Sequence, residues 1–464
     1  MKTLLESTLR HALEYLDGTP TRSVAATATL EQLRSRYHGT LPDGPTDPGE
    51  VLDQLVRNAE GGLNDTAGGR FFAWVVGGYV PASLAAEWMT SVWDQNAGLY
   101  AVAPAAVIAE EAAGKWLLEL LELPAHSAFA FVTSGQMANF TGLAAGRHAV
   151  LKRAGWDLEK EGLYGAPPIT ILTGDQRHGT IARALNFLGM GSKHVRDLPT
   201  AADGQLKPDV LKKAMEETKG PAILLLQAGD LNTGSFDPYN DLIPMAKARG
   251  VWTHVDGAFG LWARMSAAHR HLLDGVETAD SWAVDGHKWL NVPYDSGYAI
   301  VQDREALYAS MSHHAAYLAH ADDARDPMDW NPEHSRRARG FATWAAMKSL
   351  GRQGITDMIV AGCRAALEIV DGAGKLPNVQ VMARPIINQG LLRFLDPTPG
   401  ATDADHDQRT DEVAAAIRAS GEAFFACTTW RGKRVMRVSV SDWRTGPAEV
   451  KRTLAAIATA NEAD

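Results

Sequence analysis

The chain has few cysteines and no long apolar run, and each absence limits what kind of protein it can be. Only two of its 464 residues are cysteine, Cys363 and Cys427. These are too few for a disulfide framework, and their spacing fits no zinc motif. No stretch approaches the roughly 18 apolar residues of a membrane span, and the N-terminus MKTLLESTLRHALEYL carries charges where a signal peptide has an apolar core. We therefore expect a cytoplasmic protein without a membrane partner.

The chain also lacks an excess of basic residues. Its 45 Lys and Arg against 55 Asp and Glu give a formal net charge of -10 at pH 7, so we expect small substrates and no nucleic acid partner. The one basic cluster, Arg336, Arg337 and Arg339, is interpreted as the solvated start of a helix. With 45% hydrophobic residues and no internal repeat, the chain should fold throughout.

Short apolar runs alternate with helical patterns through the middle of the chain, which predicts a largely parallel sheet sandwiched by helices. The runs are residues 129–133, 169–173, 222–226 and 251–256. Three later runs, with helices between them, predict a smaller C-terminal α/β domain; they are residues 379–382, 390–394 and 435–440. We expect three parts: an N-terminal segment (1–78), a large domain (79–345) and a small domain (346–464).

The N-terminal segment shows amphipathic helices. Leucines at positions 4, 5, 9, 13 and 16 form one apolar stripe on a helix over residues 1–17, and a second helix is predicted over residues 48–60. A turn-rich connector, residues 41–49, precedes the second helix. We expect this apolar stripe to be buried against another protein surface.

Lys288 is the most informative residue of the chain. It stands in the run DSWAVDGHKWLNVPYDSGYAIV, between His287 and Trp289. Desolvation lowers the pKa of an amine from about 10.4 by up to roughly 3 to 5 units, which makes the neutral nucleophile available for Schiff-base chemistry. The alternative is a surface lysine whose stem lies on the neighbouring tryptophan. The apolar and aromatic neighbours favour the nucleophile.

A Schiff-base enzyme that uses pyridoxal phosphate (PLP) also needs an anion, a phosphate cradle and a flat group against the ring. Asp256, the pair Ser134 and Gly135, and His178 offer these at strand-to-loop junctions. Phosphate binds well at a helix N-terminus, although Ser-Gly before a helix is also a common N-cap. A metal site at His254 and Asp256 is the alternative, but no HExxH or other completing set is present.

Five motifs carry a resemblance to a known family. They are FVTSGQMANFTGLAAGR, DQRHGT, THVDGAFG, RHLLDGVETADSW and DGHKWLNVPYDSG. In their order and spacing the chain resembles the group II PLP-dependent decarboxylases, the family of the aromatic amino acid, histidine and glutamate decarboxylases, from about residue 70 to residue 457. The resemblance implies PLP-dependent transferase fold type I (aspartate aminotransferase-like) and a homodimer in which the N-terminal segment packs on the other subunit. It also implies decarboxylation of an L-amino acid to the amine and CO2.

The resemblance also implies roles for single residues. Lys288 would hold the cofactor, Asp256 would pair with the pyridine nitrogen, and His178 would stack on the ring as the third catalytic residue. The cofactor-binding residues it implies are Ser134, Gly135, Gln136, His178, Asp230, Asp256, Ala258, Asp285, His287 and Lys288. Trp74 and Tyr100 are expected to line the substrate pocket, which weakly favours aromatic or bulky substrates; they are equally consistent with ordinary core or interface aromatics.

The chain departs from the family at three positions. Pro327 falls where the decarboxylases usually carry a tyrosine that protonates the substrate carbon. Asp285 stands in place of a phosphate-contacting asparagine, and Asp230 in place of a threonine. Pro327 keeps decarboxylation with oxidation to an aldehyde, or transamination, as an alternative; a PLP-binding protein without turnover is another.

We expect the polar loop over residues 310–329 to close over the substrate. With Pro327 in the tyrosine's place, the proton would come from His178, Lys288, a loop histidine (His313 or His314) or water.

Overall fold

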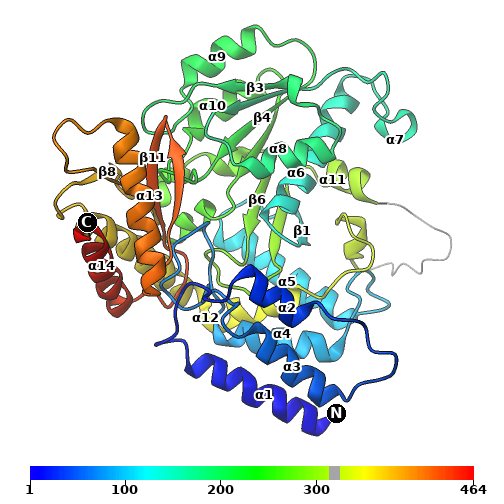
Figure 1. Cartoon of the computed structure of the whole chain (residues 1–464). Coiled ribbons are helices and arrows are strands. Elements are labelled where there is room, and N and C mark those ends of the chain that lie inside the picture. Colours follow the sequence, from blue (N-terminus) through cyan, green and yellow to red (C-terminus); the bar gives the residue numbers. More distant parts are fainter. Residues whose placement is uncertain (313–323, 464) are drawn as a thin grey trace.

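The computed structural model describes residues 1–312 and 324–463, and a seven-stranded sheet forms its centre (Figure 1). The strand order is β1-β7-β6-β5-β4-β2-β3. Neighbours run parallel from β6 to β3, whereas β7 is antiparallel to both β6 and β1. The strands are β1 (Ala128–Val132), β2 (Thr170–Gly174), β3 (Val195–Leu198), β4 (Ala222–Gln227), β5 (Trp252–Asp256), β6 (Ser281–Asp285) and β7 (Gly297–Val301). The predicted parallel sheet is confirmed.

Helices cover both faces of this sheet. The helices of this part of the chain are α4 (Pro81–Trp93), α5 (Pro104–Leu120), α6 (Gly135–Arg153), α7 (Leu158–Glu161), α8 (Gly179–Phe187), α9 (Pro208–Glu216), α10 (Tyr239–Lys247) and α11 (Arg304–Met311), with 3-10 turns η1 (Ser192–His194), η2 (Gly260–Met265), η3 (Arg270–Leu273), η4 (Val276–Thr278) and η5 (Pro327–Asp329). Of these, α4 packs mainly on α12 (Gly340–Ala373), and α7 lies beside α6 at the outer edge of the molecule. Helix α6 packs against β1, β5, β6 and β7. Two glycines permit this close approach, because a Cβ at Gly142 would lie 2.7 Å from His254 and one at Gly146 2.8 Å from Trp252.

The C-terminal part contains a second sheet with its own hydrophobic core. Its order is β10-β11-β9-β8, antiparallel throughout. The elements are α12 (Gly340–Ala373), β8 (Val379–Ala383), β9 (Gln389–Phe394), α13 (Asp403–Ser420), β10 (Ala426–Trp430), β11 (Lys433–Ser439) and α14 (Pro447–Glu462). The three predicted apolar runs correspond to β8, β9 and β11. Helix α12 crosses the predicted boundary at residue 345, with non-helical backbone at Gly351 (φ 60°), so the domain limits stay a prediction.

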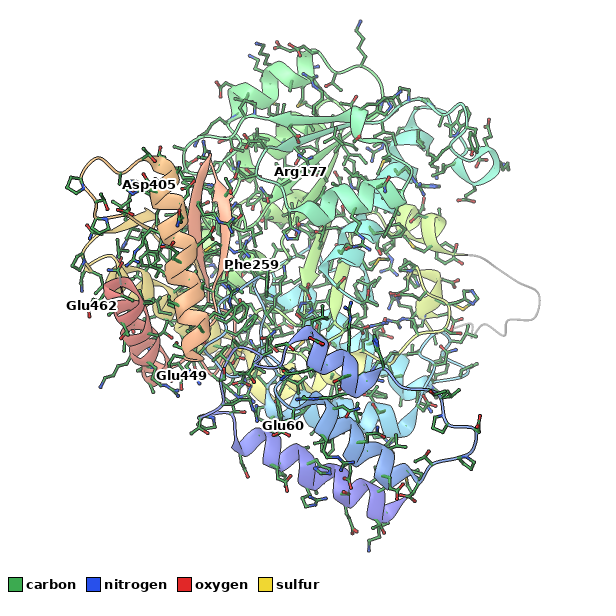
Figure 2. The ribbon with its side chains drawn as sticks, viewed as in Figure 1. Glu60, Arg177, Phe259, Asp405, Glu449 and Glu462 are labelled. Carbon is green, nitrogen blue, oxygen red and sulfur yellow. The ribbon has the colours of Figure 1, made fainter. Side chains whose placement is uncertain are left out.

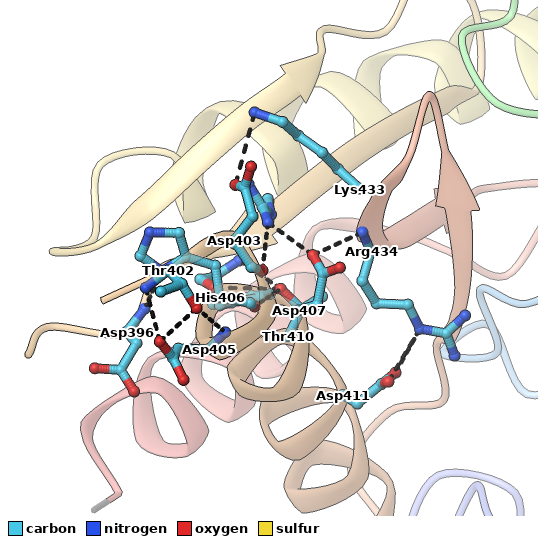
Figure 3. A network of polar contacts seen from close by, with 12 residues as sticks. Asp396, Thr402, Asp403, Asp405, His406, Asp407, Thr410, Asp411, Lys433 and Arg434 are labelled. Atoms are coloured by element: carbon cyan, nitrogen blue, oxygen red, sulfur yellow. Dashed lines mark hydrogen bonds and ion pairs between the residues drawn. The ribbon is translucent and has the colours of Figure 1, made fainter. Parts of the chain in front are cut away.

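A polar network fastens α13 to the second sheet (Figure 3). Arg393 of β9 is buried, and its guanidinium pairs with Asp403 at 2.8 Å and Asp407 at 2.7 Å. The backbone N-H of Arg434 in β11 also donates to Asp407, and the Arg434 side chain pairs with Asp411 at 2.9 Å. The acidic first turn of α13 therefore compensates the buried cation and also suits the helix dipole.

Three helices at the N-terminus, α1 (Lys2–Asp17), α2 (Leu30–Tyr37) and α3 (Pro48–Ala59), contact mainly one another. None of them contains a buried residue. Leu5, Leu9 and Leu13 of α1 are exposed, and an open hollow of about 690 Å³ lies between α1 and α3. The predicted helices are confirmed, and their apolar face has no partner within the described part of the chain.

The basic cluster before α12 is not a solvated surface. Arg336 is buried and pairs at 2.7 Å with Glu110, which is itself fully buried. Arg339 is also buried and pairs with Asp295 at 2.7 Å, while Arg337 pairs with Glu87 at the surface. Our interpretation was wrong for Arg336 and Arg339. Arg336 is buried because the buried carboxylate of Glu110 requires a cation beside it, whereas Arg339 is buried with a partner, Asp295, that is itself 41% exposed.

Both cysteines are free. Within residues 1–312 and 324–463, we find no helix with the length and apolar character needed to cross a membrane.

Candidate active site

A cavity of about 390 Å³ opens beyond the carboxyl ends of β4, β5 and β6, beside Phe259, which Figure 2 places between the two sheets. Its lining residues are Trp74, Ser134, Gly135, Gln136, Asn139, His178, Thr180, Gln227, Gly229, Leu231, Asp256, Ala258, Phe259, Asp285 and Lys288. The three predicted catalytic residues, Lys288, Asp256 and His178, are therefore brought together from three separate places in the chain. Of the other predicted site residues, only Asp230, His287 and Tyr100 do not line it.

Lys288 lies in the turn after β6 and is partly buried. Its Nζ is 5.5 Å from the centre of the Phe259 ring. Gly77 passes so close that a Cβ there would lie 1.8 Å from the Lys288 carbonyl oxygen, and the Gly77 N-H donates to the His287 carbonyl at 3.1 Å. The backbone of the lysine is thus held from a distant segment, and its amine reaches the cavity beside an aromatic face.

Asp256 ends β5 and faces the same cavity. Its register partners are Gln227 of β4 and Ala283 of β6, so it stands at the carboxyl edge of three adjacent parallel strands. Its Oδ1 accepts the Ala258 N-H at 3.2 Å. A carboxylate fixed in this way is suited to hold a protonated ring nitrogen.

His178 is the N-cap of α8, and the Thr180 N-H donates to its Nδ1 at 3.2 Å. This bond leaves the ring proton on Nε2. Burial lowers the pKa of His178, the nearby charges of Lys288 and Arg437 lower it further, and Asp256 opposes the shift. The imidazole is therefore neutral near pH 7 and can lie flat against a heteroaromatic ring.

The N-terminus of α6 forms the predicted phosphate cradle. Ser134 caps the helix, and its Oγ accepts the Met137 N-H at 3.4 Å. Asp285 occupies part of this cradle: its buried carboxylate accepts the Gly135 N-H at 2.9 Å. The other Asp285 oxygen is 2.8 Å from His287 Nδ1, at ion-pair distance but not aligned for a hydrogen bond. His287 stacks on Tyr294, with ring centres 3.9 Å apart.

Asp230 lies apart from the cavity lining. Its buried carboxylate accepts the backbone N-H groups of Asn232 at 2.8 Å and Ser235 at 3.1 Å, and the Thr233 hydroxyl. It therefore organises the turn after β4. Its predicted contact with the cofactor stays a prediction that this geometry does not support.

Tyr100 also lies away from the cavity, against the end of the predicted closing loop. Its backbone N-H donates to Asp326 at 2.8 Å, and the Met328 N-H donates to the Gly98 carbonyl at 3.0 Å. Pro327 is buried in η5, so this end of the loop is packed. His313 and His314 lie outside the described residues.

Arg437 was not predicted as a site residue; it does not line the cavity, but it lies close enough for its charge to lower the pKa of His178. It lies in β11, buried, and its Nε has no hydrogen-bond partner within the described residues. Burial lowers its pKa to about 10, against the opposing charge of Asp230. A signal was present in the sequence, because Arg437 interrupts the apolar run over residues 435–440 that predicts this strand.

A buried chain of hydrogen bonds supports the cavity wall. His254 Nε2 lies 2.8 Å from Asn139 Oδ1 and its Nδ1 2.8 Å from Ser281 Oγ, which accepts the Trp252 indole N-H at 2.9 Å. Burial lowers the pKa of His254 to about 4, so it is neutral. In the described part of the chain, no group of three His, Cys, Asp or Glu residues could hold a metal ion.

Comparison with known proteins identifies the family. The model of the pyridoxal-dependent decarboxylase conserved domain matches residues 31–393. The chain belongs to this family of decarboxylases. It is 25% identical to the aromatic-L-amino-acid decarboxylase of Bacillus atrophaeus over 94% of this chain and 90% of that one. It is 26% identical to a phenylacetaldehyde synthase of Arabidopsis thaliana, over 91% and 89%.

Solved structures agree on the fold. The crystal structure of Oryza sativa TDC with PLP and tryptamine superposes with a TM-score of 0.92 at 23% identity, covering 99% of this chain and 97% of that one. The chain therefore has the fold type I architecture, and its membership of the pyridoxal-dependent decarboxylase family shows that PLP is its cofactor. The residues around Lys288 fit the group, because the cavity offers an amine, a carboxylate, a neutral imidazole and a helix N-terminus.

Proposed function

We propose that this decarboxylase acts on an L-amino acid with an aromatic or otherwise bulky side chain and that Lys288, Asp256 and His178 carry the reaction. The supporting observation is that the three converge on one cavity with the N-terminus of α6. PLP supplies the electron sink that makes loss of CO2 feasible. Lys288 would hold the cofactor covalently until the substrate amine takes the place of the lysine amine. Asp256 would keep the ring nitrogen protonated.

Arg437 is our candidate for the substrate carboxylate. It is a buried guanidinium whose charge acts on His178, and arginine matches a carboxylate with two parallel hydrogen bonds. Trp74 supports the preference for a bulky side chain, because it lines the cavity and is 57% exposed within one subunit.

Pro327 favours a second product. In place of the family's tyrosine it offers no proton donor, and a phenylacetaldehyde synthase is among the similar proteins. Slow protonation of the substrate carbon would leave time for dissolved O2 to act as a two-electron oxidant. The substrate would then yield an aldehyde, CO2 and ammonia, while O2 is reduced to hydrogen peroxide.

We further propose that the protein is a homodimer and that it is cytoplasmic. Helices α4, α5 and α12 enclose an apolar hollow of about 530 Å³, lined by Met89, Trp93, Ile108 and Trp344 among others. This surface and the apolar stripe of α1 are both large and uncovered in one subunit. In a two-fold dimer, the α1 stripe of one subunit would cover the hollow of the other subunit. We propose that Tyr100 and Pro327 of each subunit then lie at the cavity of the partner.

Replacement of the lysine tests the proposed chemistry. Lys288→Ala should abolish the visible absorbance of the PLP-loaded protein and its turnover, because no other lysine among residues 1–312 and 324–463 lines the cavity. Lys152→Ala, an exposed lysine of α6, is the matched control and should change neither. The assay offers the proteinogenic amino acids and scores CO2, amine, aldehyde and keto acid. An unchanged spectrum with full activity in Lys288→Ala would overturn the assignment.

A further inference from the structure

Asp285 places a negative charge in the predicted cradle for the phosphate group. Its Oδ2 accepts the Gly135 N-H at 2.9 Å, and a Cβ built on Gly135 would be 3.0 Å from the same oxygen. The residue also lines the cavity that contains Lys288. The carboxylate therefore already uses one of the amide donors that a phosphate would seek at the N-terminus of α6.

The carboxylate cannot easily leave this place. The Asp285 backbone N-H donates to the Ala258 carbonyl at 2.9 Å, and only 4% of the side chain is exposed, compared with 9% for His287. Beside it stands a single histidine, whose Nδ1 is 2.8 Å from the second carboxylate oxygen without a formed hydrogen bond. Asp285 and His287 thus form a compact pair that would meet the phosphate together.

Two charges of the same sign conflict when the cofactor enters. The phosphate ester is a dianion above pH 7. A carboxylate beside it disfavours this dianion, and charges in direct contact typically shift a pKa by about 1 to 3 units. A proton on His287 would relieve the conflict, because an imidazolium attracts both the carboxylate and the phosphate.

We propose that the Asp285 and His287 pair takes up a proton when the phosphate group binds, and that Asp285 makes the cradle a weaker phosphate site than an amide there would. The proton comes from solvent and resides on the imidazole of His287; no covalent bond changes. The proposal rests on the cofactor orientation proposed above, with the phosphate at α6.

Other titratable groups around the pair do not supply this proton. Tyr294 and Tyr298 of β7 lie close enough for the charge of Asp285 to raise their pKa, and Lys288, Asp256 of β5 and His178 line the same cavity as Asp285. Burial raises the pKa of Tyr294 to about 12, and burial also raises that of Tyr298, so both are neutral near pH 8. The remaining groups would contact the ring in the proposed orientation, and the two ligands compared below share the same ring.

The test uses two ligands that cannot form a Schiff base, pyridoxine 5'-phosphate and pyridoxine, so only the phosphate differs. Calorimetric titration of the cofactor-free protein at pH 8, in buffers of different ionisation enthalpy, counts the protons taken up. We expect about one more proton for the phosphorylated ligand. Asp285→Asn, which keeps the shape and an acceptor for Gly135, should lose most of this uptake and bind pyridoxine 5'-phosphate at least about 10-fold more tightly. Pyridoxine binding should change less than about twofold.

His287→Gln provides a second variant, and it should lose the uptake while binding the phosphorylated ligand more weakly. Unfolding temperatures of all three proteins establish that each is folded. Equal proton uptake in the native protein and in Asp285→Asn, or equal affinity for pyridoxine 5'-phosphate, would overturn the proposal. If the native protein bound neither ligand nor PLP, the proposed cofactor site itself would fail, which is a distinct outcome.

Discussion

At the scale of residues, the site combines charged groups exposed to the cavity with neutral groups buried behind it. Asp256 and Lys288 face the cavity, while His254 lies fully buried two residues before Asp256 and bonds to Asn139 and Ser281. Its low pKa reflects the free-energy cost of charging a buried imidazole. This cost makes the free energy of unfolding depend on pH.

His254 should make the protein acid-sensitive. Its pKa is about 4 in the folded state and about 6.5 in an unfolded chain, so the unfolded state binds more protons between these values. The stabilisation is complete above pH 6.5 and is lost as pH falls toward 4, by at most about 3 kcal/mol.

The measurement is the free energy of unfolding from pH 7.5 to 4.5 for the native protein and His254→Gln, which keeps an amide donor for Asn139. The variant should lose less stability over this range. Asp237 and Asp442, whose pKa burial raises to about 6, act in the opposite direction in both proteins and cancel in the comparison. Parallel curves would show that His254 does not carry the effect.

At the scale of elements, strands were predictable where an apolar run marks them, whatever their place in the sheet. Such runs mark β1, β2, β4 and β5, which are almost entirely buried, although β1 lies at the sheet edge. Strands β6 and β7 are also fully buried but were not predicted as strands, because they lie in the run around Lys288 that we interpreted only as a site motif. Strands β3 and β10 lie at sheet edges and mix polar with apolar residues, so no run marks them.

The site was predictable where motifs mark strand ends and not where charges pair across the fold. Ser134, His178 and Asp256 follow apolar runs and proved to share a cavity. Asp230 in its turn and Arg336 against Glu110 depend on partners more than a hundred residues away or on turn geometry. A sequence does not display such pairings, because contact is decided by tertiary packing.

Pro327, at the packed end of the loop over residues 310–329, leads to a prediction about the ratio of amine to carbonyl product. Pro327→Tyr should raise the ratio of amine to carbonyl product, because a positioned proton donor contributes about 10²- to 10⁴-fold in rate. Pro327→Phe adds the ring without the hydroxyl and is the matched control. The ratio is measured under oxygen and under argon. If the native enzyme forms amine alone and neither oxygen nor tyrosine alters the result, another group already donates the proton.

At the scale of the whole molecule, the exposed apolar stripe of α1 supports the proposed homodimer. Leu9 and Leu13 are 46% and 49% exposed, and α1 contains no buried residue. An apolar stripe of this kind is stable when a second chain covers it.

Charges on this stripe should therefore produce a monomer. Leu9→Glu with Leu13→Glu should shift the protein to half its native mass in sizing experiments and reduce activity by more than about 10-fold, as expected when buried interface contacts are lost. Thr3→Glu, at an exposed position elsewhere on α1, is the control and should remain native in mass and activity. A fully active monomer in the double variant would contradict the proposed dimer.

The two glycines that press α6 onto β5 have a consequence for how this enzyme could diversify. Because Gly142 lies against His254 and Gly146 against Trp252, the helix bearing the predicted phosphate cradle and the strand bearing Asp256 form one rigid block. The cavity wall at Trp74 belongs to a separate segment of the chain. Mutations at that wall can change which substrate binds without disturbing the residues predicted to hold the cofactor. Substrate specificity can therefore change while the decarboxylation chemistry is kept.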